Sequence, residues 1–214
     1  MPKLRPDTQI ARREHILDAA EICFARAGFH RTTMQDICRQ AGVSPGAIYV
    51  YFASKEELIA GLCERNRAEF AKRLDQFAAG PDLISALTAM GEQYFVDEPP
   101  HKSLMTVEMG IESTRNAQVG GIYRSVDQYV IDSFEQLFGR LKETGRIAPI
   151  LPIPELARTF IVIGDGLFWR RAIDPAFDGK SMVEAVTKLA VALLNPLPEA
   201  PAVAGKSRRD GVPA

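Results

Sequence analysis

The stretch at residues 32–52, TTMQDICRQAGVSPGAIYVYF, predicts two short helices joined by a tight turn. Gly42 supplies the turn, where we expect a positive φ that glycine adopts without strain. Ser44 can cap the second helix, and Pro45 suits its first turn because no intrahelical donor is lost there. A short glycine-containing turn between two such helices is typical of a helix-turn-helix.

The second helix has almost no side chains at its start. Pro45, Gly46 and Ala47 leave its N-terminus bare, so another molecule can approach the backbone closely. Tyr49 and Tyr51 can each offer a hydroxyl to a phosphate, and free amides at a helix start favour anions. We therefore expect this helix to lie against DNA. For the two tyrosines, packing into the core with a solvated hydroxyl is the alternative.

Other candidate contacts flank these two helices. Thr33 begins the first helix, Lys55 begins the helix after the motif, and Gln35 is the best candidate for reaching a base edge. Lys55 also fits an ordinary exposed lysine beside a helix start. The predicted DNA-contacting residues are Thr33, Gln35, Ser44, Pro45, Gly46, Ala47, Tyr49, Tyr51 and Lys55.

The 214 residues carry a formal net charge of −1 that is unevenly distributed. Residues 1–55 contain eight Lys or Arg and five Asp or Glu, a net charge of +3, and the remainder carries −4. A basic N-terminal segment on an acidic body is what we expect if only that end meets phosphates. Arg5, Arg12 and Arg13 fit either a flexible arm that touches DNA or a solvated tail.

Apolar residues recur with helical spacing along the chain, which predicts an all-α fold. We expect an N-terminal three-helix domain at 1–55 and, linked to it through a helix at 54–79, a helical bundle at 56–195. Ser54 and Glu57 form a capping box at the start of the linking helix. Further helices are expected at about 82–96, 102–114, 117–144, 154–173 and 180–194. Residues 196–214 are rich in Pro and Ala and predict a disordered tail.

Residues 10–62 resemble the DNA-binding region of the TetR/AcrR family of bacterial regulators. The matching positions are Ile16-Leu17-Asp18-Ala19-Ala20, Phe24, Gly28-Phe29, Thr32-Thr33, Ile37, Ala41-Gly42-Val43-Ser44, Gly46, Ile48-Tyr49, Tyr51-Phe52, Lys55, Glu57 and Leu58. Cys38 departs from the alanine common in the family, but it is small enough to fit. The resemblance implies a homodimeric repressor that binds a palindromic operator in double-stranded DNA. It also implies that a small apolar or amphipathic effector releases the operator; control of an efflux or catabolic operon is a frequent role in the family.

The resemblance further implies an effector pocket framed by the middle helices. Its candidate lining residues are Tyr94, Met105, Glu108, Met109, Glu112, Tyr123, Asp165 and Trp169. Most of the bulky residues also fit plain core. The three acids fit exposed positions, or ion pairs with Arg115 or Arg158; otherwise one of them anchors a polar or cationic group of the effector.

Two C-terminal helices carry apolar seams of the kind expected at a helical interface. Gly164 and Gly166 would weaken the first of them in isolation, and they make sense if another helix approaches closely. The predicted dimer interface consists of Leu156, Phe160, Ile163, Gly164, Leu167, Val186, Leu189 and Leu193.

Other classes of protein have less support. Cys23, Cys38 and Cys63 share no ligand spacing with the histidines, so we expect reduced core thiols, no metal and no cofactor. Glu108 and Glu112 lie four apart as an acid/base pair would, but no phosphate loop or nucleophile elbow supports an enzyme. No apolar run reaches a membrane span and residues 1–18 lack a signal core, so we expect a cytoplasmic protein. A helical adaptor that binds proteins is the remaining alternative, although it would not need the bare helix.

Overall fold

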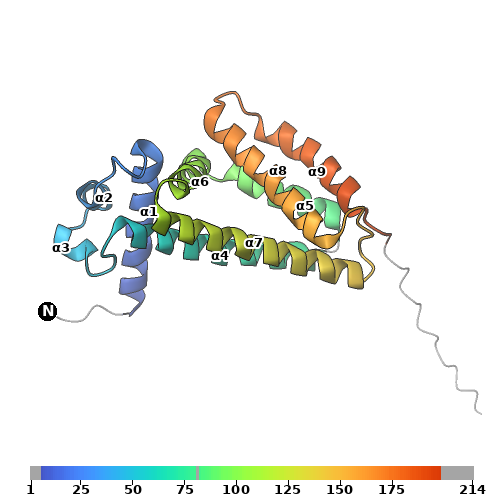
Figure 1. The fold of residues 1–214 in the computed structure, drawn as a ribbon, viewed down its shortest axis with the longest axis horizontal. Helices are drawn as coiled ribbons and strands as arrows, with labels where there is room; N and C mark the ends of the chain where they lie inside the picture. Colours follow the sequence, from blue (N-terminus) through green and yellow to red (C-terminus); the bar gives the residue numbers. More distant parts are fainter. Residues whose placement is uncertain (1–5, 81, 199–214) are drawn as a thin grey trace, which may run out of the picture.

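The computed structural model describes residues 6–80 and 82–198, except the side chains of Pro6 and Asp7, and these residues form helices and no strand. The elements, shown in Figure 1, are α1 (Pro6–Ala27), α2 (Met34–Ala41), α3 (Pro45–Ile48), α4 (Lys55–Ala79), α5 (Leu83–Glu92), the π-helix η1 (Gln93–Asp97), α6 (Pro100–Ser113), α7 (Ala117–Glu143), α8 (Ile153–Ile173) and α9 (Gly179–Leu194). The predicted all-α fold, with an N-terminal helix-turn-helix and a C-terminal helical part, is confirmed. Lys3 and Arg5 and the predicted tail from residue 199 onward lie outside the described residues.

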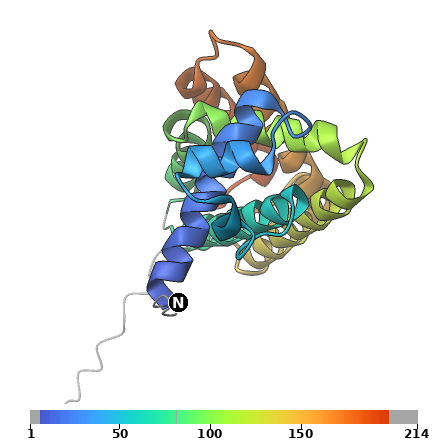
Figure 2. The ribbon, with the colours of Figure 1, turned by 90° about the vertical axis from the view of Figure 1, so that its left-hand side faces the viewer.

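The helices separate into two ends joined by a long pair. α1, α2 and α3 form one end, and α5, α8 and α9 lie at the other (Figure 1). α4 and α7 pack against each other along the length between them, and α6 packs on both α1 and α8. The molecule viewed from the α1–α3 end is shown in Figure 2.

Local sequence accounts for most of the helix ends. Gly28 ends α1 at φ +78° and Gly42 ends α2 at φ +61°, a left-handed backbone that favours glycine. Asp82 and Asn116 cap α5 and α7, because each side chain accepts hydrogen bonds from two free amides of the first turn.

Two of the predicted caps differ in the structure. Ser44 occupies the N-cap position of α3, but its side chain makes no capping hydrogen bond. Its carbonyl oxygen accepts from the amides of Ala47 and Ile48 instead. Ser54 accepts from the Glu57 amide as expected, whereas the Glu57 carboxylate accepts from the amide of Ala53 rather than that of Ser54. The reciprocal half of the capping box is therefore displaced by one residue.

Two of the predicted segments need correction. The helix expected at 82–96 is an α-helix that changes to a π-helix at Gln93–Asp97, so its last turn is wider. The disorder expected from residue 196 is wrong for the first residues of that segment, because Leu197 donates its amide to Arg146 O at 2.9 Å and Ala148 donates to Asn195 O at 3.0 Å. These bonds tie residues 195–197 to the segment between α7 and α8.

The hydrophobic core links the two ends of the molecule. The core around α1, α2 and the start of α4 includes Met105 and Met109 from α6 and Val119 from α7. A second core joins the C-terminal half of α4 to α5, α7, α8 and α9. The N-terminal helices therefore do not pack as a unit closed at residue 55, since α6 contributes buried side chains to their core. Among the described residues, no helix combines the length and apolar character needed to cross a membrane.

Candidate nucleic-acid interface and ligand cavity

The predicted recognition helix lies at an exposed end of the molecule (Figure 2). Ser44, Pro45 and Gly46 are exposed, and a Cβ placed on Gly46 would meet no atom within 4 Å. Tyr49 is 56% exposed, and its neighbour Val50, which the sequence did not single out, is 78% exposed. An exposed tyrosine and an exposed valine side by side are free to contact another molecule.

Thr33 and Asp36 form a reciprocal cap at the start of α2. The Thr33 hydroxyl accepts from the Asp36 amide, and the Asp36 carboxylate accepts from the Thr33 amide at 2.9 Å. Hydrogen bonds from Thr33 and then from Arg39 lower the pKa of Asp36 to about 2. Gln35 lies exposed on the same helix. The T-x-x-D spacing marks this cap, which the sequence interpretation had overlooked.

Tyr51 and Lys55 are less free than Tyr49. Tyr51 is half-buried and packs against the N-terminal core. Its ring therefore packs in the core, which was the alternative to a DNA contact. The Lys55 ammonium lies 4.2 Å from the centre of the Phe29 ring and donates to Phe29 O at 2.5 Å. Lys55 therefore connects the start of α4 to the segment that follows α1. Whether these residues contact DNA stays a prediction.

The basic residues of α1 do not form a separate arm. Arg13 pairs with Glu64 on α4 at 2.8 Å and lies over the Phe52 ring. Arg12 is exposed, and it also belongs to the helix. Residues 12 and 13 are thus part of the folded N-terminal end.

Two acids of α6 contact the segment that follows α1. The Glu108 carboxylate accepts from the Phe29 amide at 2.9 Å, and Glu112, 2% exposed, pairs with His30 at 2.8 Å. The structure shows neither Arg115 nor Arg158 as their partner, so the alternative of those ion pairs does not hold for these two acids. The two carboxylates therefore hold α6 against the segment that follows α1.

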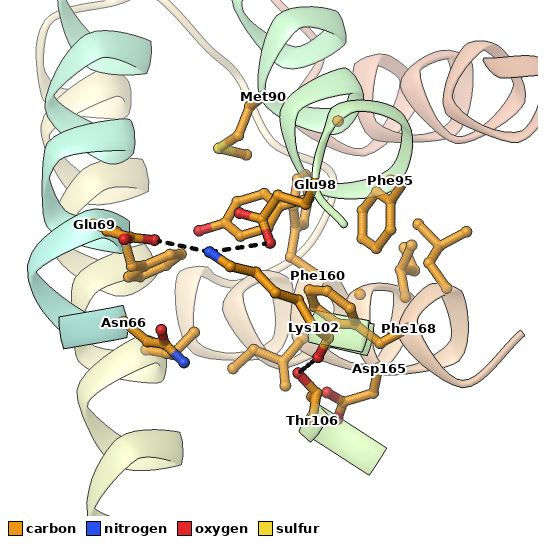
Figure 3. Close-up of a pocket in the computed structure, with 18 of the residues that line it drawn as sticks. Asn66, Glu69, Met90, Phe95, Glu98, Lys102, Thr106, Phe160, Asp165 and Phe168 are labelled. Atoms are coloured by element: carbon orange, nitrogen blue, oxygen red, sulfur yellow. Dashed lines mark hydrogen bonds and ion pairs between the residues drawn. The ribbon is translucent and has the colours of Figure 1, made fainter. Parts of the chain in front are cut away.

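A cavity of about 330 Å³ lies between α4, α5, α6, α7, α8 and α9 (Figure 3). Five of the predicted effector-pocket residues line it: Tyr94, Met105, Met109, Tyr123 and Asp165. Glu108, Glu112 and Trp169 do not; Trp169 is 47% exposed on α8. The remaining lining is mainly apolar and aromatic, and it includes Phe70 of α4, Phe134 of α7 and Phe160 of α8. Such a cavity matches the size and chemistry of small-molecule sites.

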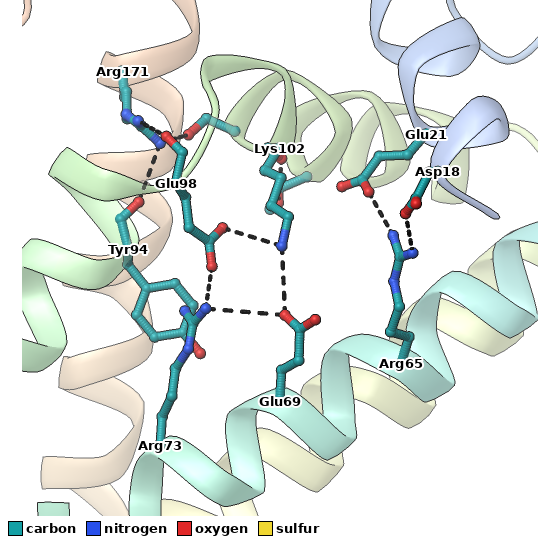
Figure 4. Close-up of polar contacts among 11 residues, drawn as sticks. Asp18, Glu21, Arg65, Glu69, Arg73, Tyr94, Glu98, Lys102 and Arg171 are labelled. Carbon is teal, nitrogen blue, oxygen red and sulfur yellow. Dashed lines mark hydrogen bonds and ion pairs between the residues drawn. The ribbon is translucent and has the colours of Figure 1, made fainter. Parts of the chain in front are cut away.

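One side of the cavity carries a network of ion pairs (Figures 3 and 4). Lys102 of α6 lies 3.4 Å from Glu69 and 3.8 Å from Glu98, and Glu98 also pairs with Arg73. Arg73 lies 4.0 Å from the Tyr94 ring centre, and burial raises the pKa of Tyr94 to about 12. These charges neutralise one another, so this side offers little net charge to a ligand.

A second set of ionisable groups has no such partner. Asp127 of α7 and Asp165 of α8 both line the cavity, and within the described residues neither makes an ion pair. Asp165 lines the cavity while part of its surface remains exposed, and its partial burial and then the neighbouring Asp127 raise its pKa. Burial and then these two carboxylates raise the pKa of Tyr123 as well. The sequence had marked Asp165 and Tyr123 but missed Asp127, which sits among ordinary helix-surface residues.

Most of the predicted dimer residues point into the chain. Phe160, Ile163, Gly164, Leu167 and Val186 line the cavity, Leu156 is completely buried, and Leu193 packs against the second core. Leu189 is exposed. The expected stripe is therefore an intrachain seam apart from Leu189, because apolar spacing identifies a buried face without saying which helix covers it. The exposed apolar residues of these two helices are Val162, Trp169, Ile173, Met182 and Leu189.

Comparison with known proteins identifies related regulators. Residues 16–62 match the family model for bacterial regulatory proteins of the tetR family. The HTH-type transcriptional regulator UidR of Escherichia coli (strain K12) is 27% identical over 141 residues, which cover 64% of this chain and 69% of that protein.

Solved structures share the whole fold. GusR of Salmonella enterica has a TM-score of 0.74 at 25% identity, over 90% of this chain and 98% of that one. FadR of Bacillus subtilis, solved in complex with stearoyl-CoA, has a TM-score of 0.71 at 20% identity, over 84% of this chain and 97% of that one. The likeness extends from the helix-turn-helix through the C-terminal helices.

Proposed function

Because the chain belongs to the TetR family of bacterial transcriptional regulators, we propose that it is a ligand-responsive repressor that binds a palindromic operator as a homodimer. A small apolar or amphipathic effector enters the cavity and causes release of the DNA. The observation that carries this proposal is the position of α6, which lines the cavity through Met105 and Met109 and holds α1 through Glu108. A DNA-binding protein of this kind acts in the cytoplasm, and the genes it controls serve efflux or catabolism of the effector.

The DNA contact is assigned to the exposed end formed by α2 and α3. In the proposal, the bare start of α3 enters the major groove, and Tyr49 and the backbone amide of Gly46 contact phosphates. Thr33, Tyr51 and Lys55 add backbone contacts, and Gln35 reads a base edge. Two such helices in a dimer reach successive major grooves, about 34–36 Å apart.

The effector response is assigned to the connection between the cavity and Phe29. The Phe29 peptide is held from both sides, since its amide donates to Glu108 of α6 and its carbonyl accepts from Lys55 of α4. A ligand that displaces α6 would change both contacts and reorient α3. The effector then needs only to bind the released form more tightly by a few kcal/mol to remove the protein from DNA. FadR, whose structure contains stearoyl-CoA, is a related fold that holds an amphipathic ligand.

The dimer is assigned to the outer faces of α8 and α9. Val162 is 70% exposed and Trp169 lies seven residues further along the same helix, with Met182 and Leu189 exposed on α9. α8 and α9 lie together on the side of the molecule away from α4 (Figure 1). A face of this type, with a large aromatic residue among aliphatic ones, is suited to self-association.

The test is binding of the full chain to DNA flanking its own gene, measured by fluorescence anisotropy at several salt concentrations. We expect a sequence-selective complex that weakens steeply with salt, because phosphate contacts release counterions. Tyr49→Phe and Lys55→Ala should each weaken binding to every sequence by about tenfold, the loss expected for one charged hydrogen bond. Gln35→Ala should instead change base preference.

The matched control is Lys180→Ala, which removes an exposed lysine from the start of α9, outside the α1–α3 end. Melting curves confirm that each variant is folded, which matters for Lys55 because it also contacts Phe29. If no salt-sensitive, sequence-selective complex forms, the chain is not a DNA-binding repressor. The helical adaptor is then the remaining alternative, and it predicts a protein partner instead of DNA.

A further inference from the structure

The polar lining of the cavity divides into two regions of different charge balance. In the first, Lys102 and Arg73 neutralise Glu69 and Glu98. In the second, Asp127 and Asp165 face the same space with no ion pair among the described residues. Figure 3 shows the Lys102 ammonium directed toward Glu69 and Glu98, with Asp165 away from that group. The unpaired negative charge is therefore confined to one region.

The other lining cation does not neutralise this region. Arg67 of α4 contacts the Ser125 hydroxyl and lies 5.4 Å from the Tyr129 ring centre. The causes that raise the pKa of Asp165 are burial and Asp127, with no cation lowering it. Two like charges held in a partly desolvated space repel each other, and a positive charge between them would relieve that cost.

We propose that the cavity takes an organic cation with an aromatic or aliphatic body, whose positive charge lies against Asp127, Asp165 and the ring of Tyr123. The inference rests on the proposed function, because it names the ligand class for the same cavity. Tyr123 comes from the same helix as Asp127, one turn earlier, and its ring supplies an electron-rich face that attracts a cation. The apolar body fits among Phe70, Phe134 and Phe160.

An organic cation fits this lining better than a metal ion. Hard divalent cations need about six oxygen ligands, and the described residues contain no group of three or more His, Cys, Asp or Glu that could hold one. Most of the lining is apolar, which a bare ion cannot use. The volume of about 330 Å³ accommodates a body of one or two aromatic rings with a charged head.

The test uses three probes that share a naphthalene body and differ in charge. They are (2-naphthylmethyl)trimethylammonium, its neutral carbon isostere 2-neopentylnaphthalene, and 2-naphthylacetate. Dissociation constants are measured with the full-length protein, and release of the bound operator is followed in parallel. We expect the cation to bind at least about tenfold more tightly than the neutral isostere, and the anion to bind most weakly.

Variants assign that preference to the two carboxylates. Asp127→Asn and Asp165→Asn keep the side-chain volume, so binding of the neutral probe should stay unchanged while each reduces the preference for the cation. The double variant should abolish the preference. Asp132→Asn, on the exposed side of α7, is the control that should leave all three constants unchanged.

The outcomes separate this inference from the proposed function. Equal affinity for the cation and its neutral isostere, or tighter binding of naphthylacetate or of stearoyl-CoA, would overturn the cation assignment. If such a probe also releases the operator, the proposed function as a ligand-responsive repressor is kept and only the cation assignment fails. If no probe and no acyl-CoA binds or releases DNA, both proposals fail. A change of oligomeric mass in Asp165→Asn with no change in charge preference would instead place Asp165 at an interface between copies and refute the inference.

Discussion

Cys63 lies where α4 passes α1, and its environment makes it a packing residue rather than a reactive one. Burial raises the pKa of Cys63 to about 11 and also raises the pKa of Cys23 and Cys38. All three thiols are free and buried. Since only the thiolate reacts, we expect none of the three to react with Ellman's reagent at pH 8 in the native protein, and all three after unfolding in guanidinium. Rapid labelling of the folded protein would contradict this and indicate a thiol open to oxidants.

Asp165 should lower the stability of the ligand-free protein at neutral pH. Its pKa is raised in the folded chain, so the folded state binds this proton more tightly than the unfolded state does. The stabilisation is present below the ordinary value of 3.8 and is lost as the pH rises through the folded pKa. Asp165→Asn should therefore raise the melting temperature at pH 7, and the gain should shrink toward pH 4. A pH-independent gain, or the same gain in Asp132→Asn, would argue against this origin.

Polar residues were the hardest to place from sequence, because their partners are distant along the chain. Glu108 stood out as an acid in apolar surroundings, but the amide it binds belongs to Phe29, 79 positions earlier. Asp127 gave no signal, since nothing local shows that Asp165 of another helix faces it. Lys55 was recognised as a motif residue, whereas its contact with Phe29 O depends on the crossing of α1 and α4. The type of each side chain is known from the sequence, but the partner that it contacts is determined by the tertiary fold.

At the scale of elements, local sequence signals predicted the helices better than they predicted the partners of polar side chains. Several helix ends coincide with a glycine of positive φ or with an Asp, Asn or Thr cap, and those signals lie within four residues of the helix end they mark. The change to a π-helix at Gln93–Asp97 was missed because no cap or breaker marks it. The seams of α8 and α9 were predicted as apolar, but whether they meet α6, α7 or another copy is a matter of tertiary packing.

α6 is the element on which the proposed response depends, and Glu108 is its contact with the DNA-binding end. Glu108→Ala removes the acceptor for the Phe29 amide at 2.9 Å. We expect it to weaken the coupling between ligand and operator, so that the effector changes operator affinity less, while the affinity of the effector for the free protein stays within about twofold.

Glu108→Gln tests whether the hydrogen bond is responsible, because its amide oxygen can still accept from Phe29. It should restore most of the coupling. Glu143→Ala, near the end of α7 and away from α1, should have no effect. The assignment fails if Glu108→Ala leaves the effector's influence on operator affinity unchanged in a protein that folds normally.

At the scale of the whole molecule, charge and packing divide the chain differently. Residues 1–55 carry a net charge of +3 in the sequence, in agreement with a DNA-binding role for the exposed α1–α3 end, although Lys3 and Arg5 lie outside the described residues. The hydrophobic core is not divided at residue 55, since Met105, Met109 and Val119 pack with α1. Because this shared core joins the α1–α3 end to the helices that line the cavity, the proposed response needs no flexible linker between the cavity and the DNA contact.

The proposed dimer makes a prediction at this scale. Val162 and Trp169 are exposed on α8, and a charge introduced there would be buried without a partner in the dimer. We expect the native protein to have twice the chain mass of 23.6 kDa by light scattering, and Val162→Glu or Trp169→Glu to shift it toward the single-chain mass. Operator affinity should fall at least about tenfold, because each monomer keeps only one recognition helix. Ile84→Glu is the matched control, since Ile84 is as exposed as Trp169 but lies on α5. A native mass of one chain, or dimers that survive both α8 substitutions, would move the interface elsewhere.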